Sequence, residues 1–154
     1  MSSSCHSFEP LLCKWLRATQ PKKVLEWGPG KSTELIHKEA PIANILSIES
    51  QKAFAKKAAL DFPFAKVVHA PIPEYGPSEY PCWPLLHAKG QVFDFIFVDG
   101  RQRVSCLLTC LHVLAPSGVV VLHDAKRLHY QHGLQLFEKL DDDDDGDTIA
   151  LRPL

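Results

Sequence analysis

The chain has 154 residues, of which 45% are hydrophobic and 23% charged, as expected for one soluble globular domain with a core of its own. Its formal net charge is −1, and six acidic residues lie within 141–147, so the remainder carries a small excess of basic residues. That excess is too small to indicate a nucleic-acid surface, and no apolar run is long enough to span a membrane, so neither partner is expected.

The N-terminal segment, 1–21, is predicted to hold one amphipathic helix. Apolar residues recur at helical spacing from Phe8 to Leu16, Ser7 is suited to the N-cap, and the pattern ends before Pro21. Such a helix would cover the edge or a face of a sheet.

The segment from Lys23 to Thr33, KVLEWGPGKST, is the one around which the predicted domain is organised. It combines a short apolar strand, an acid at Glu26, a turn through Gly28 and Gly30, and a helix start. Glycines allow a close approach of the backbone to a ligand, and a helix start offers unpaired N–H groups. The segment therefore predicts a corner that binds a nucleotide-like ligand.

Strands and helices alternate along the chain. The expected strands cover 24–26, 44–49, 66–69, 92–98, 119–122 and 148–151. The expected helices cover 32–40, 52–60 (with Phe54 and Ala58 facing inward), 104–114 and 130–137. Alternating elements with continuously apolar strands are typical of a mostly parallel sheet covered by helices on both faces. The fold class is therefore predicted to be α/β, a single-domain three-layer sandwich spanning 1–154.

Two segments lack this pattern. Residues 70–91 contain five prolines and three of the larger aromatic residues, which predicts a packed loop beside a pocket and no helix. The acidic run 141–147 is predicted to be a solvated surface loop, because it lacks the ligand spacing of an EF-hand.

The five cysteines include no CxxC pair, and Cys106 and Cys110 lie four residues apart on one predicted helix face. We interpret them as buried, reduced thiols. This interpretation argues against a zinc site and a disulfide framework, and it favours a cytoplasmic protein.

Polar side chains stand at the carboxyl ends of the expected strands, where ligands bind in open α/β sheets. They are Glu26, Glu49, His69, Asp99 and the pair His123 and Asp124. Strand ends that reach solvent are often polar without a function, but the carboxylates at most of these ends favour a ligand site. Glu49, about 20 residues past the glycine turn, is placed to accept hydrogen bonds from a ribose.

Three ligands compete for the glycine turn. A P-loop would need a glycine where the chain has Leu25, and Glu26 would repel phosphates. A dinucleotide motif would need a third glycine where Thr33 stands. S-adenosylmethionine offers a ribose for Glu49 and cationic groups for the carboxylates, so it is favoured on electrostatic grounds. A P-loop-like phosphotransferase and a non-catalytic cofactor-binding protein stay as alternatives.

Four segments resemble class I S-adenosylmethionine-dependent methyltransferases. VLEWGPG (24–30) resembles the first motif of that family, and ILSIE (45–49) resembles its second-strand acid. FDFIFVDGRQR (93–103) and LAPSGVVVLHDAKR (114–127) resemble a subgroup of small methyltransferase-like proteins with a VDGRxR signature. The resemblance implies a Rossmann-like methyltransferase fold whose cofactor-binding core covers 22–130. Here its terminal antiparallel hairpin is expected to be shortened to one strand.

By this resemblance, the chain would transfer a methyl group from S-adenosylmethionine to an oxygen or nitrogen of a small molecule. The cofactor-binding residues would be Glu26, Trp27, Gly28, Gly30, Ser32, Glu49, His69, Ala70 and Asp99. Glu26 and the glycines would line the methionine part, and Glu49 would hold the ribose. His69 and the backbone of Ala70 would lie by the adenine, and Asp99 near the sulfonium.

Asp99, His123 and Asp124 are the candidate bases for removing a proton from the acceptor. Asp99 and Asp124 also resemble the magnesium ligands of metal-dependent O-methyltransferases. Arg101 would compete as a cation, so a divalent metal is left open and not favoured.

Arg101, Arg103 and Tyr130 are the expected substrate-binding residues. The two arginines are suited to clamp a carboxylate of the substrate, and a salt bridge that fixes the start of the next helix is the alternative for them. A homodimer is left open.

Overall fold

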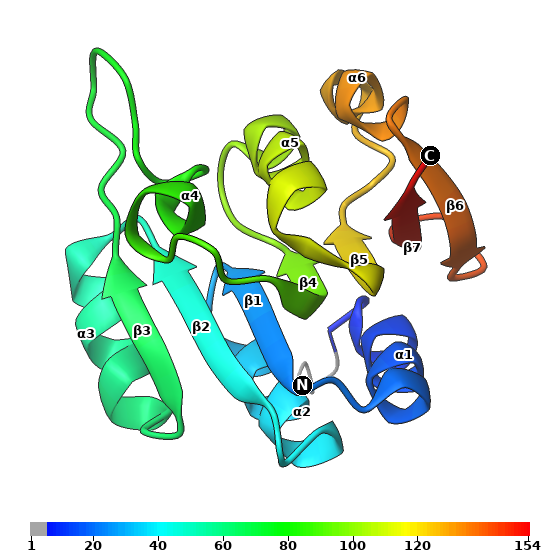
Figure 1. The fold of residues 1–154 in the computed structure, drawn as a ribbon, viewed down its shortest axis with the longest axis horizontal. Coiled ribbons are helices and arrows are strands. Elements are labelled where there is room, and N and C mark those ends of the chain that lie inside the picture. The colour runs from blue at the N-terminus through cyan, green and yellow to red at the C-terminus, as the bar shows by residue number, and fades with distance from the viewer. Residues whose placement is uncertain (1–5) are drawn as a thin grey trace.

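The computed structural model describes residues 6–154, so Cys5 lies outside the described residues. Its centre is a seven-stranded sheet with the order β3-β2-β1-β4-β5-β7-β6 (Figure 1). The strands are β1 (Lys23–Trp27), β2 (Asn44–Glu49), β3 (Ala65–His69), β4 (Phe93–Val98), β5 (Leu114–His123), β6 (Phe137–Asp142) and β7 (Thr148–Pro153). Strands β1 to β5 pair in parallel, and β7 runs antiparallel to both β5 and β6.

Helices cover both faces of this sheet. They are α1 (Glu9–Thr19), α2 (Lys31–Glu39), α3 (Lys52–Asp61), α4 (Trp83–His87), α5 (Arg103–Val113), the 3-10 helix η1 (Leu128–Tyr130) and α6 (Gln131–Leu134). Helices α1 to α3 lie on one face and α4 to α6 on the other (Figure 1), which confirms the predicted three-layer α/β class. Between residues 6 and 154, no helix is long and apolar enough to cross a membrane.

The central strands are apolar throughout because each sends alternate side chains to the two helical layers. In β4, Phe95 and Phe97 pack against the layer of α1 and α2, whereas Ile96 and Val98 pack against the layer of α5. All four side chains are fully buried. The predicted continuous apolar strands are therefore the ones that position the site, since their carboxyl ends meet along one edge.

The C-terminal hairpin is complete, which corrects the prediction that it is shortened to one strand. β6 and β7 pair from Phe137 opposite Pro153 to Asp142 opposite Ile149. The acidic run therefore begins inside an edge strand and not in a loop. Asp141 is accommodated there because Lys14 Nζ and Trp15 Nε1 of α1 donate to it, at 2.7 Å and 2.9 Å.

Two helix predictions were wrong in the second half of the chain. The proline-rich segment contains α4, which tolerates Pro84 because it occupies the first turn, where a proline costs no intrahelical hydrogen bond. The helix predicted over 130–137 ends at Leu134, and Phe137 belongs to β6.

Two smaller predictions also fail. Ser7 does not cap α1, whose N-cap is Phe8 without a capping side chain. Phe54 points outward with 55% of its surface exposed, whereas Ala58 is buried as predicted.

Candidate functional site

Glu26 ties the glycine turn to the sheet from below. Its fully buried carboxylate accepts hydrogen bonds from the hydroxyls of Ser32 at 2.7 Å, Thr33 at 2.6 Å and Ser47 at 2.7 Å. Burial raises the pKa of Glu26, and the three hydroxyl donors offset part of that rise. Its side chain points under the turn, towards α2, and a contact between Glu26 and the ligand stays a prediction.

Trp27 is also a core residue, and its predicted contact with the cofactor stays a prediction. It is fully buried, and its indole N–H donates to the carbonyl of Tyr80 at 2.9 Å. Ser32 does border the cavity described next, but it is only 2% exposed and its hydroxyl donates to Glu26.

The glycine turn forms one wall of a cavity of about 380 Å³ at the carboxyl ends of β1, β2 and β4. Gly28 adopts φ +91°, and a Cβ at this position would lie 2.7 Å from the carbonyl oxygen of Asp99, so the turn requires glycine. The cavity is lined by Phe8, Gly28, Pro29, Gly30, Lys31, Ser32, Glu49, Ser50, Gln51, Phe54, Tyr80, Asp99, Gly100, Arg101 and Arg103, together with His6.

Glu49 and Asp99 bring two of the predicted carboxylates to this cavity. Glu49 is the last residue of β2 and Asp99 follows β4, and these two strands pair with β1 on either side of it. The carboxylate of Glu49 accepts the backbone N–H of Gln51 at 2.8 Å, which fixes its position at the end of β2. The predicted convergence of strand ends is thus confirmed for Gly28, Glu49 and Asp99.

His69 and Ala70 line a separate, neighbouring cavity of about 480 Å³ with Trp83 and His87 of α4. The backbone N–H of Ala70 donates to the carbonyl of Glu49 at 2.8 Å. His69 Nε2 lies 3.2 Å from the carbonyl of Ser50. These two bonds join the second cavity to the end of β2.

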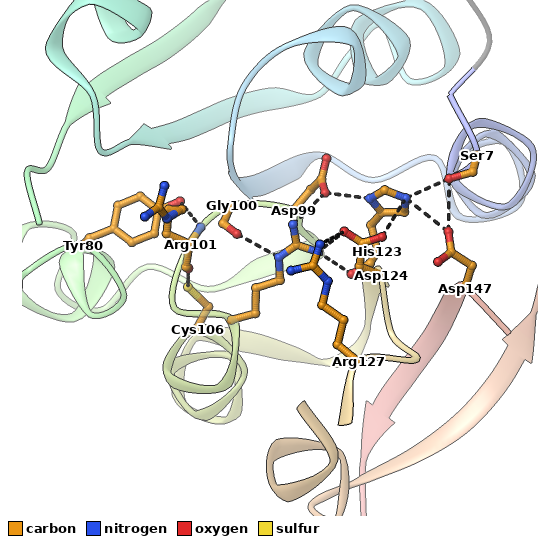
Figure 2. Close-up of polar contacts among 11 residues, drawn as sticks. Ser7, Tyr80, Asp99, Gly100, Arg101, Cys106, His123, Asp124, Arg127 and Asp147 are labelled. Atoms are coloured by element: carbon orange, nitrogen blue, oxygen red, sulfur yellow. Dashed lines mark hydrogen bonds and ion pairs between the residues drawn. The ribbon is translucent and has the colours of Figure 1, made fainter. Parts of the chain in front are cut away.

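A charged cluster joins the ends of β4 and β5 to the start of the described chain and to the C-terminal hairpin (Figure 2). His123 Nδ1 lies 2.8 Å from Asp99, and its Nε2 lies 2.8 Å from Ser7 Oγ and 3.3 Å from Asp147. Ser7 Oγ also donates to Asp147 at 3.1 Å. Both ring nitrogens therefore have partners, and the imidazole connects segments far apart in the sequence.

Arg103 supplies positive charge to this cluster. Its guanidinium lies 3.2 Å from Asp99 and 3.6 Å from Asp124, and it donates to the carbonyls of Gly100 and His123. The salt-bridge alternative is thus confirmed for Arg103. Because an arginine stands between Asp99 and Asp124, these two carboxylates do not fit a metal ion.

His123 is disposed to carry a proton. Burial lowers the pKa of His123, but the hydrogen bond to Asp99 and the negative charges of Asp99, Asp124 and Asp147 outweigh that effect, so the net shift is upward. His123, Asp124 and Asp147 place ligand atoms within 4.8 Å of one another.

Among the three candidate bases, only Asp99 lines the cavity beside the glycine turn. Asp124 adopts φ +58° after β5 and turns towards Arg103 and Arg127, which lie 3.6 Å and 3.4 Å away. His123 faces the cluster on both sides of its ring. A catalytic role for His123 and Asp124 stays a prediction.

A third, larger cavity of about 820 Å³ borders the first. It lies between the loop around Ser78, the start of α5 and residues 127–130. Arg101 and Arg103 border both cavities, whereas Tyr130 borders only the larger one. All three predicted substrate-binding residues therefore meet at this place.

Some residues of the site escaped sequence reasoning. Ser7 and Asp147 are 140 positions apart, and no local pattern links them. Tyr80 accepts the N–H of Arg101 at 3.2 Å through its hydroxyl, yet in the sequence it is one aromatic residue of a proline-rich segment. Only Arg127 had a signal in the sequence, because it is the last residue of the segment 114–127 that resembles the methyltransferase-like subgroup.

Comparison with known proteins places the fold. No family model matches the sequence, and no curated protein matches it. Among solved structures, a methyltransferase-like protein from Silicibacter pomeroyi superposes with a TM-score of 0.73 at 21% identity, over 97% of this chain and 90% of that one.

Two further structures carry the demethylated cofactor product. A methyltransferase from Podospora anserina bound to S-adenosylhomocysteine (SAH) gives a TM-score of 0.71 at 18% identity, over 100% of this chain and 80% of that one. An O-methyltransferase from Bacillus cereus in complex with SAH gives 0.72 at 14% identity, over 97% and 81%. The chain therefore has the Rossmann-like fold of these methyltransferases.

Proposed function

We propose that the chain transfers a methyl group from S-adenosylmethionine to an oxygen or nitrogen of a small-molecule acceptor. The observation that carries the proposal is one cavity that Gly28, Glu49 and Asp99 border together at the carboxyl ends of three adjacent strands. The fold supports it, because two similar structures are described as bound to SAH.

Each wall of the cavities has a role in this proposal. The turn from Gly28 to Gly30 holds the methionine part, and Glu49 accepts hydrogen bonds from the ribose hydroxyls. The cavity next to His69 and Ala70 takes the adenine, against the ring of Trp83. Because the N–H of Ala70 is already used, contact with the adenine there would come from packing and from side chains.

The turn argues against a P-loop-like phosphotransferase. The N–H of Gly28 donates to the carbonyl of Ile48, and the N–H of Gly30 donates to the hydroxyl of Thr33, both at 3.0 Å. These donors are therefore not available to cradle phosphates. The lining of the cavity combines the carboxylates of Glu49 and Asp99 with the basic side chains of Lys31, Arg101 and Arg103, so the carboxylates are placed to face the cationic groups of the cofactor.

The chemistry asks little of the chain beyond positioning. S-adenosylmethionine supplies an activated methyl group on a cationic sulfur. We call the cavity of about 380 Å³ the cofactor cavity and the neighbouring cavity of about 820 Å³ the acceptor cavity. Asp99 borders the cofactor cavity and is the group placed to accept the proton that the acceptor oxygen or nitrogen loses. His123 and Arg103 hold the Asp99 carboxylate in place through contacts of 2.8 Å and 3.2 Å.

We infer that the protein works in the cytoplasm, since Cys13, Cys82, Cys106 and Cys110 are unpaired thiols among the described residues. A VDGRxR subgroup identity and a homodimer stay predictions.

Isothermal titration calorimetry with SAH and with ATP, each with and without MgCl₂, tests the proposal. We expect SAH to bind, ATP not to bind, and magnesium to have no effect on SAH affinity. Glu49→Gln should weaken SAH binding by about tenfold, because a charged hydrogen-bond acceptor is lost. Glu34→Gln, on the exposed side of α2, is the matched control and should bind as the wild type does. Tighter binding of ATP than of SAH would refute the proposal.

A further inference from the structure

The cavity of about 820 Å³ is the place where an acceptor would sit, and its position is set by three segments. Ser78 and Pro81 come from the proline-rich segment, Gln102 and Ser105 from the start of α5, and His129 from η1. It meets the cofactor cavity along Gly100, Arg101 and Arg103, which border both. A molecule in it therefore lies next to Gly100, the residue that follows Asp99 at the end of β4.

The ionisable side chains that line this cavity include basic groups and no carboxylate. Its lining includes Arg101, Arg103, Arg127 and His129, and none of its lining residues is acidic. Arg103 is 10% exposed, and Asp99 and Asp124 balance its charge. The side chain of Arg127 is 58% exposed and shares Asp124 at 3.4 Å.

Among the three arginines that line this cavity, Arg101 is the one without a counter-charge within residues 6–154. Within residues 6–154, its guanidinium has no ion pair or hydrogen bond, and its backbone is fixed by the bond from its N–H to Tyr80 and by the thiol of Cys106 on its carbonyl. Figure 2 shows its side chain directed away from the charged cluster. An ordered backbone thus presents a guanidinium with nothing bound to it.

The start of α5 adds further donors to the same wall. Its N-cap, Gln102, has φ +49° and makes no capping hydrogen bond with its side chain, and Val104 and Ser105 of the first turn line the cavity. The free N–H groups and the dipole of an 11-residue helix favour an anion at this end.

We propose that the methyl acceptor is an organic anion whose carboxylate or phosphate is bound by Arg101 and Arg127 at the start of α5. The inference rests on the proposed function, of which it names the substrate class. Guanidinium groups bind planar oxyanions through paired hydrogen bonds, which orients the ligand as well as holding it. Because Arg101 borders both cavities, the bound anion holds the molecule at their shared wall, with its nucleophilic oxygen or nitrogen towards the cofactor cavity.

The test measures binding of matched probes to the SAH-saturated protein by calorimetry. The probes are 3,4-dihydroxybenzoate, its neutral analogue 3,4-dihydroxybenzamide, and phenyl phosphate. We expect the wild type to prefer either anion over the amide by about tenfold or more, with a preference that weakens as NaCl is raised. Arg101→Gln and Arg127→Gln should each lose most of that preference. Arg152→Gln, a surface arginine paired with Glu138 on the hairpin, should keep it.

The outcomes separate this inference from the proposed function. Each variant is first titrated with SAH, and each is melted to establish that it is folded. A wild type that does not bind SAH refutes the proposed function. A wild type that binds SAH but binds the benzoate no better than the amide overturns the anionic acceptor, as does an undiminished preference in both arginine variants.

Discussion

Glu26→Gln distinguishes a residue that supports the site from one that contacts the ligand. The carboxylate of Glu26 accepts three hydroxyl hydrogen bonds and has no exposed surface. One of its oxygens serves both Thr33 and Ser47. In the variant, one oxygen becomes an NH₂ group that donates and does not accept. We therefore expect a loss of stability that comes from the folded core.

The size of the loss follows from these contacts. If the amide nitrogen takes the place that serves Thr33 and Ser47, two buried hydroxyl hydrogens lose their acceptor. At about 1 to 1.5 kcal/mol for each lost bond, the variant should be less stable by about 2 to 3 kcal/mol. That is a large part of the roughly 5 to 15 kcal/mol typical of a domain.

Urea denaturation at pH 7 measures the loss, read from the midpoint at an unchanged m-value. The exposed Glu34→Gln serves as the control and should change stability by no more than about 0.5 kcal/mol. The folded variant should bind SAH with nearly wild-type affinity. An unchanged stability with a large loss of SAH affinity would show that Glu26 contacts the ligand directly.

The stability of the same variant as a function of pH tests the direction of the pKa shift of Glu26. Burial raises the pKa of Glu26 in the folded state above its ordinary value of 4.5. A proton bound more tightly by the folded state stabilises it fully below pH 4.5, and this contribution is lost as the pH rises through the folded pKa. Glu26→Gln should remove that decline, so the stability difference between variant and wild type should be largest at low pH.

Two further substitutions test the surroundings of the cavity. Because the pKa of His123 is raised in the folded state, its contribution to stability is complete below pH 6.5 and is lost as the pH rises through the folded pKa. His123→Gln should therefore flatten the profile of melting temperature against pH between pH 5.5 and 8.5. An unchanged profile would refute the role given to the charged cluster. Gly28→Ala places a methyl group 2.7 Å from the carbonyl of Asp99 and should lower both the melting temperature and SAH affinity. Gly76→Ala shares the positive φ without any atom within 4 Å, so a smaller loss there isolates the clash.

The fold could be predicted where burial dictates the sequence pattern. The five parallel strands are recognisable because both of their faces are covered. The hairpin was missed because β6 is an edge strand: Asp141 and Asp142 fit it only through partners such as Lys14 of α1, which no local pattern reveals. The helix predicted from Tyr130 to Phe137 fails for a related reason, since its apolar spacing is shared between a short helix and the first residue of a strand.

The site could be predicted in part because strand ends meet at one edge. Glu26 and Glu49 face the same side of the sheet, since Glu26 pairs with Ser47, but Glu49 is the last residue of β2 and borders the cavity, whereas Glu26 lies deeper and its carboxylate accepts the hydroxyl of Thr33 in α2. Contacts between residues far apart in the sequence could not be predicted either. Nothing near Ser7 in the sequence indicates a partner at Asp147, because a folded topology alone brings them together.

The charges of the two cavities are arranged in a way that suits the proposed reaction. Both carboxylates, Glu49 and Asp99, border the cofactor cavity, Arg101 and Arg103 border both cavities, and Arg127 borders only the acceptor cavity. In methyl transfer, positive charge leaves the sulfur and develops on the acceptor before its proton departs. Asp99 borders the cofactor cavity and is followed by Gly100 and Arg101 of the shared wall, so its carboxylate is placed to favour the positive charge on the sulfur and on the acceptor. Arg103, which lies between Asp99 and Asp124, holds that carboxylate in place.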